Sequence, residues 1–146
     1  METSQEFQVD LYWQENQKAI LSAAIFNDSI EVSSSSCFKK SDGAAWSAEH
    51  LFIASVESSY MTGFFRVAKH KGLTFKSYTS TARASTLISD EFSEITDIVI
   101  RPIVVITDRD KISRVLKIFS ICRDHSLVLN ALKIRLHVFP SVKVSL

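Results

Sequence analysis

Hydrophobic and polar positions alternate along the first part of the chain and predict short strands there. Residues 7–13 alternate in this way at their start, and after a polar turn the apolar segment 19–26 returns as a second strand, which indicates a hairpin. A third, shorter strand is expected at 30–32, after another turn. The serine run at 33–36 then predicts a loop.

A segment that is apolar around most of its circumference follows and predicts a long helix. Ser47 is its expected N-cap, and Glu49 suits the positive end of the helix dipole. The apolar segment covers residues 51–71, and Gly72 is expected to end the helix. Such a helix is normally buried on several sides, and a second subunit is one way to bury it in a chain this small.

The second half of the chain predicts strands again. Residues 73–87 and 92–106 read as two strands with no helix between them, which favours an antiparallel pair. Pro102 lies inside the second of them and predicts a bulge or an edge position. Apolar side chains alternate once more over residues 134–138, so a strand is expected near the end of the chain.

A shorter helix is expected between these strands. Asp108 is its predicted N-cap, and the apolar stripe over residues 112–122 has the i, i+3, i+4, i+7 spacing of an amphipathic helix. Helices segregated from antiparallel strands indicate the α+β class. With 146 residues, one domain over positions 1–146 is expected.

Composition narrows the classes of function. Lys and Arg number 17 against 16 for Asp and Glu, so no excess charge points to nucleic acid or an anionic membrane. No apolar stretch is long enough to cross a bilayer and the N-terminus carries no signal peptide, so the expected compartment is the cytoplasm. Cys37 and Cys122 lie far apart and form no CxxC motif, so neither a disulfide framework nor a metal or other cofactor is expected.

Two segments resemble motifs of the OsmC/Ohr family of organic hydroperoxide reductases. Residues 47–59 read SAEHLFIASVESS and resemble the family's S-P-E-x-L-x-A-A-x-x-x-x-C, which opens a long central helix. Residues 125–132 read HSLVLNAL and resemble the family's H-C-P-x-S-N-x-L. The order of the elements around both motifs also fits, so the resemblance covers nearly the whole chain.

The resemblance implies an α+β fold with antiparallel sheets and a long central helix, assembled as an intertwined homodimer with two sites at the subunit interface. It also implies a chemistry in which a cysteine thiolate attacks an organic hydroperoxide and becomes a sulfenic acid. A second cysteine then condenses with it to a disulfide, which an external thiol reduces. The family's glutamate and an arginine from an early loop help to hold the thiolate.

The chain departs from this pattern at the reactive positions. Ser59 and Ser126 stand where the family has its two cysteines, and no arginine precedes Arg66. A serine hydroxyl cannot be oxidised to a sulfenic state, so these residues cannot run the family reaction. Glu49 and His125 are the polar motif residues that remain; Glu49 reads either as a site carboxylate or as a charge that interacts with the helix dipole.

The sequence leaves three functions open. The first is an OsmC-like protein that has lost thiol peroxidase activity and binds a small apolar molecule at the dimer interface, in a pocket near Ser59, Ser126 and Glu49 with His125 and Tyr60 as further lining candidates. The second is an active peroxide reductase that uses Cys122, which otherwise reads as a buried structural thiol. The third is an interaction module without a pocket.

Overall fold

The computed structural model describes residues 2–33 and 45–146. Cys37, with most of the serine run, lies outside the described residues. The chain divides into two compact units, residues 1–52 and 53–146. Helix α1 (Ala48–His70) begins in the first unit and continues through the second.

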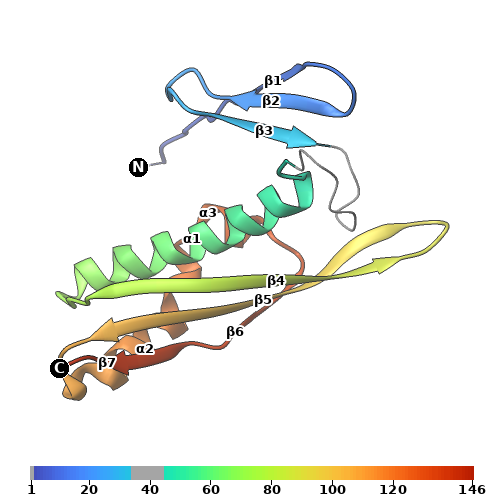
Figure 1. Cartoon of the computed structure of the whole chain (residues 1–146). Helices are drawn as coiled ribbons and strands as arrows, with labels where there is room; N and C mark the ends of the chain where they lie inside the picture. The colour runs from blue at the N-terminus through green and yellow to red at the C-terminus, as the bar shows by residue number, and fades with distance from the viewer. Residues whose placement is uncertain (1, 34–44) are drawn as a thin grey trace. The chain divides into compact units, whose positions relative to one another are not determined.

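The first unit contains a small antiparallel sheet in the order β1-β2-β3 (Figure 1). Its strands are β1 (Asp10–Trp13), β2 (Lys18–Ser22) and β3 (Ser29–Ser33). The predicted hairpin and third strand are confirmed, although β1 and β2 are shorter than expected. Asn16 supports the tight turn between them with a φ of 54°, in the left-handed region that asparagine tolerates better than most residues.

Helix α1 begins and ends where the sequence predicts. The backbone N–H of His50 donates to Ser47 Oγ at 3.3 Å, which is the expected N-cap hydrogen bond. At the other end Gly72 has a φ of 64° and follows the last helical turn. The backbone N–H of Leu73 donates to the carbonyl of Ala68, so the chain closes the helix by a left-handed turn.

The second unit contains a mixed sheet built around one long central strand. Strands β4 (Ser77–Ile88) and β5 (Ser93–Ile106) form the predicted antiparallel pair, with a register shift at Ser85 and Thr86. On its other side β5 pairs in parallel with β6 (Arg135–Val138) and then with β7 (Ser141–Val144). The closing strand is therefore two strands, and both run parallel to β5.

Pro102 corrects one prediction, because it lies in a central strand and not at an edge or at the bulge. The carbonyls of Ile100 and Ile106 accept from the β6–β7 side, at Phe139 and Ser145. Residues that alternate along a strand point to the same side, so the nitrogen of Pro102 faces this side as well. This nitrogen lies opposite the gap between the end of β6 and the start of β7, so the missing N–H of Pro102 costs no hydrogen bond of the sheet.

The shorter helices follow β5 in a continuous run. Asp108 caps a 3₁₀ turn, η1 (Arg109–Lys111), by accepting from the backbone N–H of Asp110, and α2 (Ile112–Ile121) follows directly. The helix ends in a second 3₁₀ turn, η2 (Cys122–His125). The last helix, α3 (Leu127–Ala131), begins immediately afterwards.

The core of the second unit is formed by α1, α2 and the helix-facing side of the sheet (Figure 1). The ring of Phe64 stacks on that of Phe119, with centroids 4.5 Å apart. A Cβ atom added at Gly63 would lie 2.6 Å from the carbonyl oxygen of Cys122, so glycine permits the close crossing of α1 and η2. The strand residues of this core are Ile98, Ile100, Val104 and Ile106.

Candidate functional site

The two serines that the resemblance assigns to the cysteine positions have different environments. Ser126 is 6% exposed and caps α3, since its Oγ accepts from the backbone N–H of Leu129 at 3.2 Å. Ser59 is half-buried on α1, and its hydroxyl forms no hydrogen bond with another described residue. No hydrogen bond joins the two hydroxyls, so the hydroxyl of Ser126 has a structural role of its own.

Glu49 lies exposed in the first turn of α1. No ion pair or hydrogen bond reaches its carboxylate from the described part of the chain. The neighbouring contact belongs to Ser47 and His50, whose Oγ and Nδ1 atoms are 2.6 Å apart. This geometry agrees with interaction with the helix dipole, while the grouping of Glu49 with Ser59 and Ser126 in one site stays a prediction.

Cys122 is fully buried, as expected for a structural thiol. Its Sγ lies 3.6 Å from the carbonyl oxygen of Phe119, and the hydroxyl of Tyr60 donates to the same oxygen at 2.8 Å. Burial raises the pKa of the Cys122 thiol and also that of the Tyr60 hydroxyl. Because the thiolate is the reactive form, this environment opposes nucleophilic chemistry at Cys122.

Polar groups near the middle of α1 face strand β4. Glu57 accepts a 2.6 Å hydrogen bond from the hydroxyl of Ser80, which gives this half-buried carboxylate a partner that its own helix does not offer. The hydroxyl of Tyr78 is buried without a hydrogen-bond partner among the described residues. Burial raises the pKa of Tyr78, so this hydroxyl stays protonated.

Two of the predicted pocket residues line different hollows within the chain, and a pocket at a dimer interface stays a prediction. His125 lines a hollow beside the C-terminal half of α1, whereas Tyr60 lines another between α2 and the end of β6. In the described part of the chain, no three His, Cys, Asp or Glu side chains are close enough to hold a metal ion. None of its helices is long and apolar enough to span a bilayer.

A third hollow, which we call the sheet cavity, lies within the first unit between the β1–β3 sheet and the first turns of α1. Its volume is about 550 Å³. Cross-strand neighbours Leu11 and Leu21, together with Trp13 and Ala19, place one apolar face of the sheet against it. The remaining lining residues are Asn16, Gln17, Lys18, Val32, Ser33, Ala48 and Leu51.

The sheet cavity was not predicted from the sequence. Its signal was the alternation that begins at residue 7, which assigns the odd-numbered side chains of the first strand to one face of the hairpin. The pairing of β3 with β2 brings Val32 beside Ala19 on that same face. Only the paired strands show that these side chains line one hollow.

No family model and no curated protein sequence matches the chain. Solved structures do match it. An OsmC-like protein of unknown function from Vibrio cholerae has 18% sequence identity and a TM-score of 0.81, over 94% of this chain and 99% of its own. An organic hydroperoxide resistance protein from Elizabethkingia anophelis, with bound thiocyanate, has 12% identity and a TM-score of 0.72, over 99% and 100%.

A second Vibrio cholerae structure, a putative organic hydroperoxide resistance protein with captopril bound in one of its active sites, has 15% identity and a TM-score of 0.65. It matches over 97% of this chain and 95% of its own. The architecture expected from the two sequence motifs is thus confirmed. The chain has the α+β fold of OsmC-like and organic hydroperoxide resistance proteins.

Proposed function

We propose that this OsmC-fold chain does not run the two-cysteine peroxidase reaction and instead binds a small, mostly apolar molecule. The observation that carries the proposal is the pair of serines at the two motif positions. Oxygen at Ser59 and Ser126 cannot accept oxidising equivalents from a hydroperoxide as a sulfur atom does. The N-cap role of Ser126 supports a structural use of that position.

Burial of Cys122 supports the same conclusion. A buried thiol with a raised pKa is a poor substitute for the missing reactive cysteine. We place the protein in the cytoplasm, where reducing conditions keep an isolated thiol of this kind reduced.

Peroxide consumption tests the loss of activity. The wild-type chain is incubated with cumene hydroperoxide and dithiothreitol, and the expected rate equals that of the two reagents alone. Cys37→Ser and Cys122→Ser variants are assayed in parallel. Turnover by the wild type that either substitution abolishes would overturn the proposal.

A double substitution tests the assignment of the two serine positions. The Ser59→Cys/Ser126→Cys variant, in a Cys37→Ser/Cys122→Ser background, is treated with hydroperoxide and its peptides are mapped without reduction. We expect a disulfide between the two introduced cysteines, because the resemblance assigns these positions to a pair that forms one. A folded variant that keeps two free thiols would contradict the assignment.

The sheet cavity supports binding of an apolar molecule. Its volume of about 550 Å³ lies in the range of small-molecule sites, and its lining combines aliphatic and indole side chains with a few polar groups. The captopril-bound structure from Vibrio cholerae is a protein of the same fold that holds a small molecule. The cavity lining does not include Ser59 or Ser126.

Cumyl alcohol is a suitable probe, since it is apolar and cannot be reduced as a peroxide. We expect saturable binding, followed by NMR shifts of residues lining the sheet cavity. Ala19→Trp fills the cavity and is expected to abolish these shifts, while Ala24→Trp, at an exposed position, serves as the control. Equal binding by the wild type and Ala19→Trp would contradict this location.

We also propose a second copy of the chain as the partner, as the resemblance implies. Large apolar side chains outside the sheet cavity are exposed in the first unit, including Tyr12 at 63%, Ile25 at 84% and Phe26 at 66%. Large apolar side chains exposed in such number favour an interaction surface. Sedimentation equilibrium is expected to give twice the chain mass, and a monomer over the whole accessible concentration range would contradict the dimer.

A further inference from the structure

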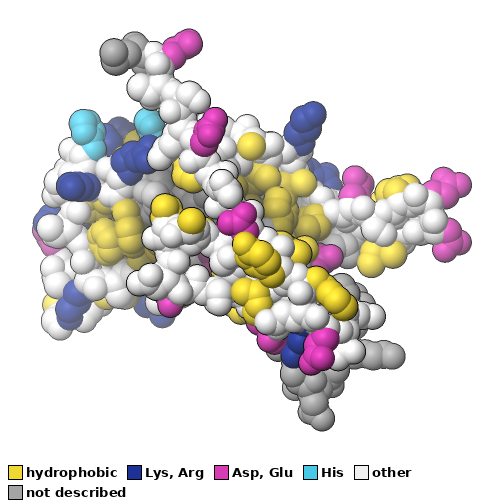
Figure 2. Space-filling view, turned by 90° about the horizontal axis from the view of Figure 1, so that it is seen from above, with side chains coloured by type: hydrophobic (Ala, Val, Ile, Leu, Met, Phe, Trp, Pro, Cys, Tyr) yellow, Lys and Arg dark blue, Asp and Glu magenta, His cyan; other side chains and the backbone are white. Residues whose placement is uncertain are grey.

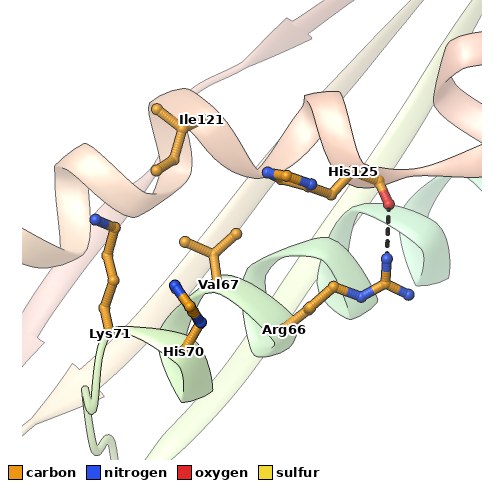
Figure 3. Close-up of a pocket in the computed structure, with 6 residues that line it drawn as sticks. All are labelled: Arg66, Val67, His70, Lys71, Ile121 and His125. Carbon is orange, nitrogen blue, oxygen red and sulfur yellow. Dashed lines mark hydrogen bonds between the residues drawn. The ribbon is translucent and has the colours of Figure 1, made fainter.

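A hollow in the second unit, which we call the basic hollow, lies between the C-terminal half of α1 and the α2–η2 segment (Figure 3). Its volume is about 450 Å³, within the range of small-molecule sites. Two aliphatic and four basic side chains line it. They are Val67, Ile121, Arg66, His70, Lys71 and His125.

The basic groups surround an apolar floor. Figure 3 shows Arg66 and Lys71 at opposite ends of the hollow, with Val67 and Ile121 between them. Arg66 and Lys71 are five positions apart, so their backbones are separated by about 7.5 Å along the helix axis. The imidazoles of His70 and His125 lie between these ends, at the sides of the floor (Figure 3).

No carboxylate neutralises these groups among the residues that the structure describes. Arg66 donates one hydrogen bond, at 3.3 Å, to the backbone carbonyl of His125. This contact orients the guanidinium toward the hollow's end and leaves further N–H groups for a ligand. The space-filling view also shows histidine side chains beside Lys and Arg side chains at one end of the molecule (Figure 2).

Compensation of the helix dipole does not account for the whole cluster. Basic residues favour the last turn of a helix, where carbonyl groups lack partners. Here the carbonyl of Ala68 accepts from the N–H of Leu73, and that of Lys71 accepts from Arg114 at 2.8 Å. Furthermore, His125 comes from a different element, so its position over the hollow has no relation to the end of α1.

We propose that the basic hollow binds a small organic dianion, a dicarboxylate whose two acidic groups are joined by a short apolar chain. One carboxylate pairs with the guanidinium of Arg66, whose planar N–H groups match a carboxylate in geometry. The other pairs with the ammonium group of Lys71. The methylene chain covers Val67 and Ile121, and the imidazoles flank it.

The arrangement disfavours two simpler anions. A monocarboxylate leaves the cation at one end without a partner. Inorganic phosphate engages one end and leaves the aliphatic floor uncovered. The ligand that uses both ends and the floor therefore has two charges separated by methylene groups.

Isothermal titration calorimetry at constant ionic strength tests the proposal. The ligands are succinate, glutarate and adipate, and hexanoate and inorganic phosphate serve for comparison. At least one dicarboxylate is expected to bind at least about fivefold more tightly than hexanoate or phosphate. Equal or tighter binding of hexanoate or phosphate would overturn the proposal, as would the absence of binding by every dicarboxylate.

Neutral substitutions test which cations are used. Arg66→Gln and Lys71→Gln are each expected to weaken dicarboxylate binding by about fivefold to tenfold, since one charge-assisted contact is lost in a partly exposed site. Lys69→Gln is the matched control, because Lys69 lies in the same helical turn but does not line the hollow. All three side chains are exposed, so the fold is expected to be unaffected.

The control also separates specific contacts from net charge. A loss of affinity in Lys69→Gln equal to that in Lys71→Gln would show a general charge effect and overturn the assigned contacts. Dependence on only one of Arg66 and Lys71 would overturn the two-ended binding mode.

Discussion

The two units differ in where they keep their large apolar side chains. In the second unit α1, α2 and the central strand bury aromatic and branched residues completely, among them Tyr60, Phe64 and Ile100. In the first unit Leu11, Trp13 and other large side chains are exposed. None of the buried hydrophobic residues of the described chain belongs to the three-stranded sheet.

This difference shows that the second unit has a hydrophobic core of its own, whereas the three-stranded sheet of the first unit has none among the described residues. Sheets of few short strands gain independent stability by packing a hydrophobic face against something else. The first unit offers such a face at the sheet cavity and further apolar side chains outside it. This is where a bound apolar molecule and a second chain would contribute most.

Truncation of a core residue should give the largest effect. Phe64→Ala removes a fully buried ring that contacts Phe75, Tyr78 and Phe119, and should lower the free energy of unfolding by about 3–5 kcal/mol. Trp13→Ala, in the first unit, should change it by less than about 0.5 kcal/mol in dilute protein. Guanidinium unfolding measures both, and equal losses would remove the contrast between the units.

A methyl group added at the crossing of α1 and η2 should have the next largest effect on the free energy of unfolding. Gly63→Ala would normally stabilise a helix by about 1 kcal/mol. Here the new Cβ meets the backbone carbonyl of Cys122 at 2.6 Å, so the variant should lose about 1–3 kcal/mol. Ser58→Ala, at an exposed position of the same helix, is the control and should be nearly neutral. A stabilised Gly63→Ala would show that the crossing is looser than the structure indicates.

The two helix caps offer a direct comparison between the units. Ser126→Ala, in the second unit, and Ser47→Ala, in the first, each remove a hydroxyl that accepts from the backbone N–H three positions further along the chain. Each should lower stability by about 1 kcal/mol, measured by urea unfolding. Threonine at either position should restore most of the loss. A neutral Ser126→Ala would contradict the structural role assigned to that hydroxyl.

The smallest effect on stability is expected from Asp97, which lies on the sheet of the second unit. A hydrogen bond from His137, together with contacts from Thr96 and Arg135, lowers the pKa of Asp97. The contribution of Asp97 to stability is therefore present above the ordinary aspartate pKa of about 3.9 and lost as pH falls through the lowered folded value. NMR titration should show this lowered pKa, and His137→Ala should raise it. An unchanged value in that variant would exclude the imidazole as the main cause.

Local patterns determined much of the fold from the sequence. Ser47 and Gly72 bound α1 because capping and left-handed turns depend on residues within a few positions of each other. The antiparallel pair β4–β5 was predictable since no helix separates its strands. The two motifs at 47–59 and 125–132 indicated the architecture that the solved structures then matched.

Long-range pairing was not predictable in the same way. The split of the last strand into β6 and β7, and the place of Pro102 at the break between them, depend on which segments meet across β5. The partner of Glu57 is likewise a residue of β4, Ser80, rather than one of its own helix. The spacing of residues along the sequence does not indicate which distant residues become neighbours in the fold.

For the candidate site, the sequence by itself determined that Ser59 and Ser126 carry oxygen rather than sulfur, since the identity of an atom does not depend on folding. The sequence also shows that basic residues, Arg66 and Lys71 among them, lie near the end of α1. Only the tertiary structure decided that His125 reaches the same hollow as Arg66 and Lys71, and that Cys122 is sealed in the core. The reason is physical: a cavity and the burial of a thiol arise from packing between elements far apart along the chain, whereas oxidation chemistry belongs to the element itself.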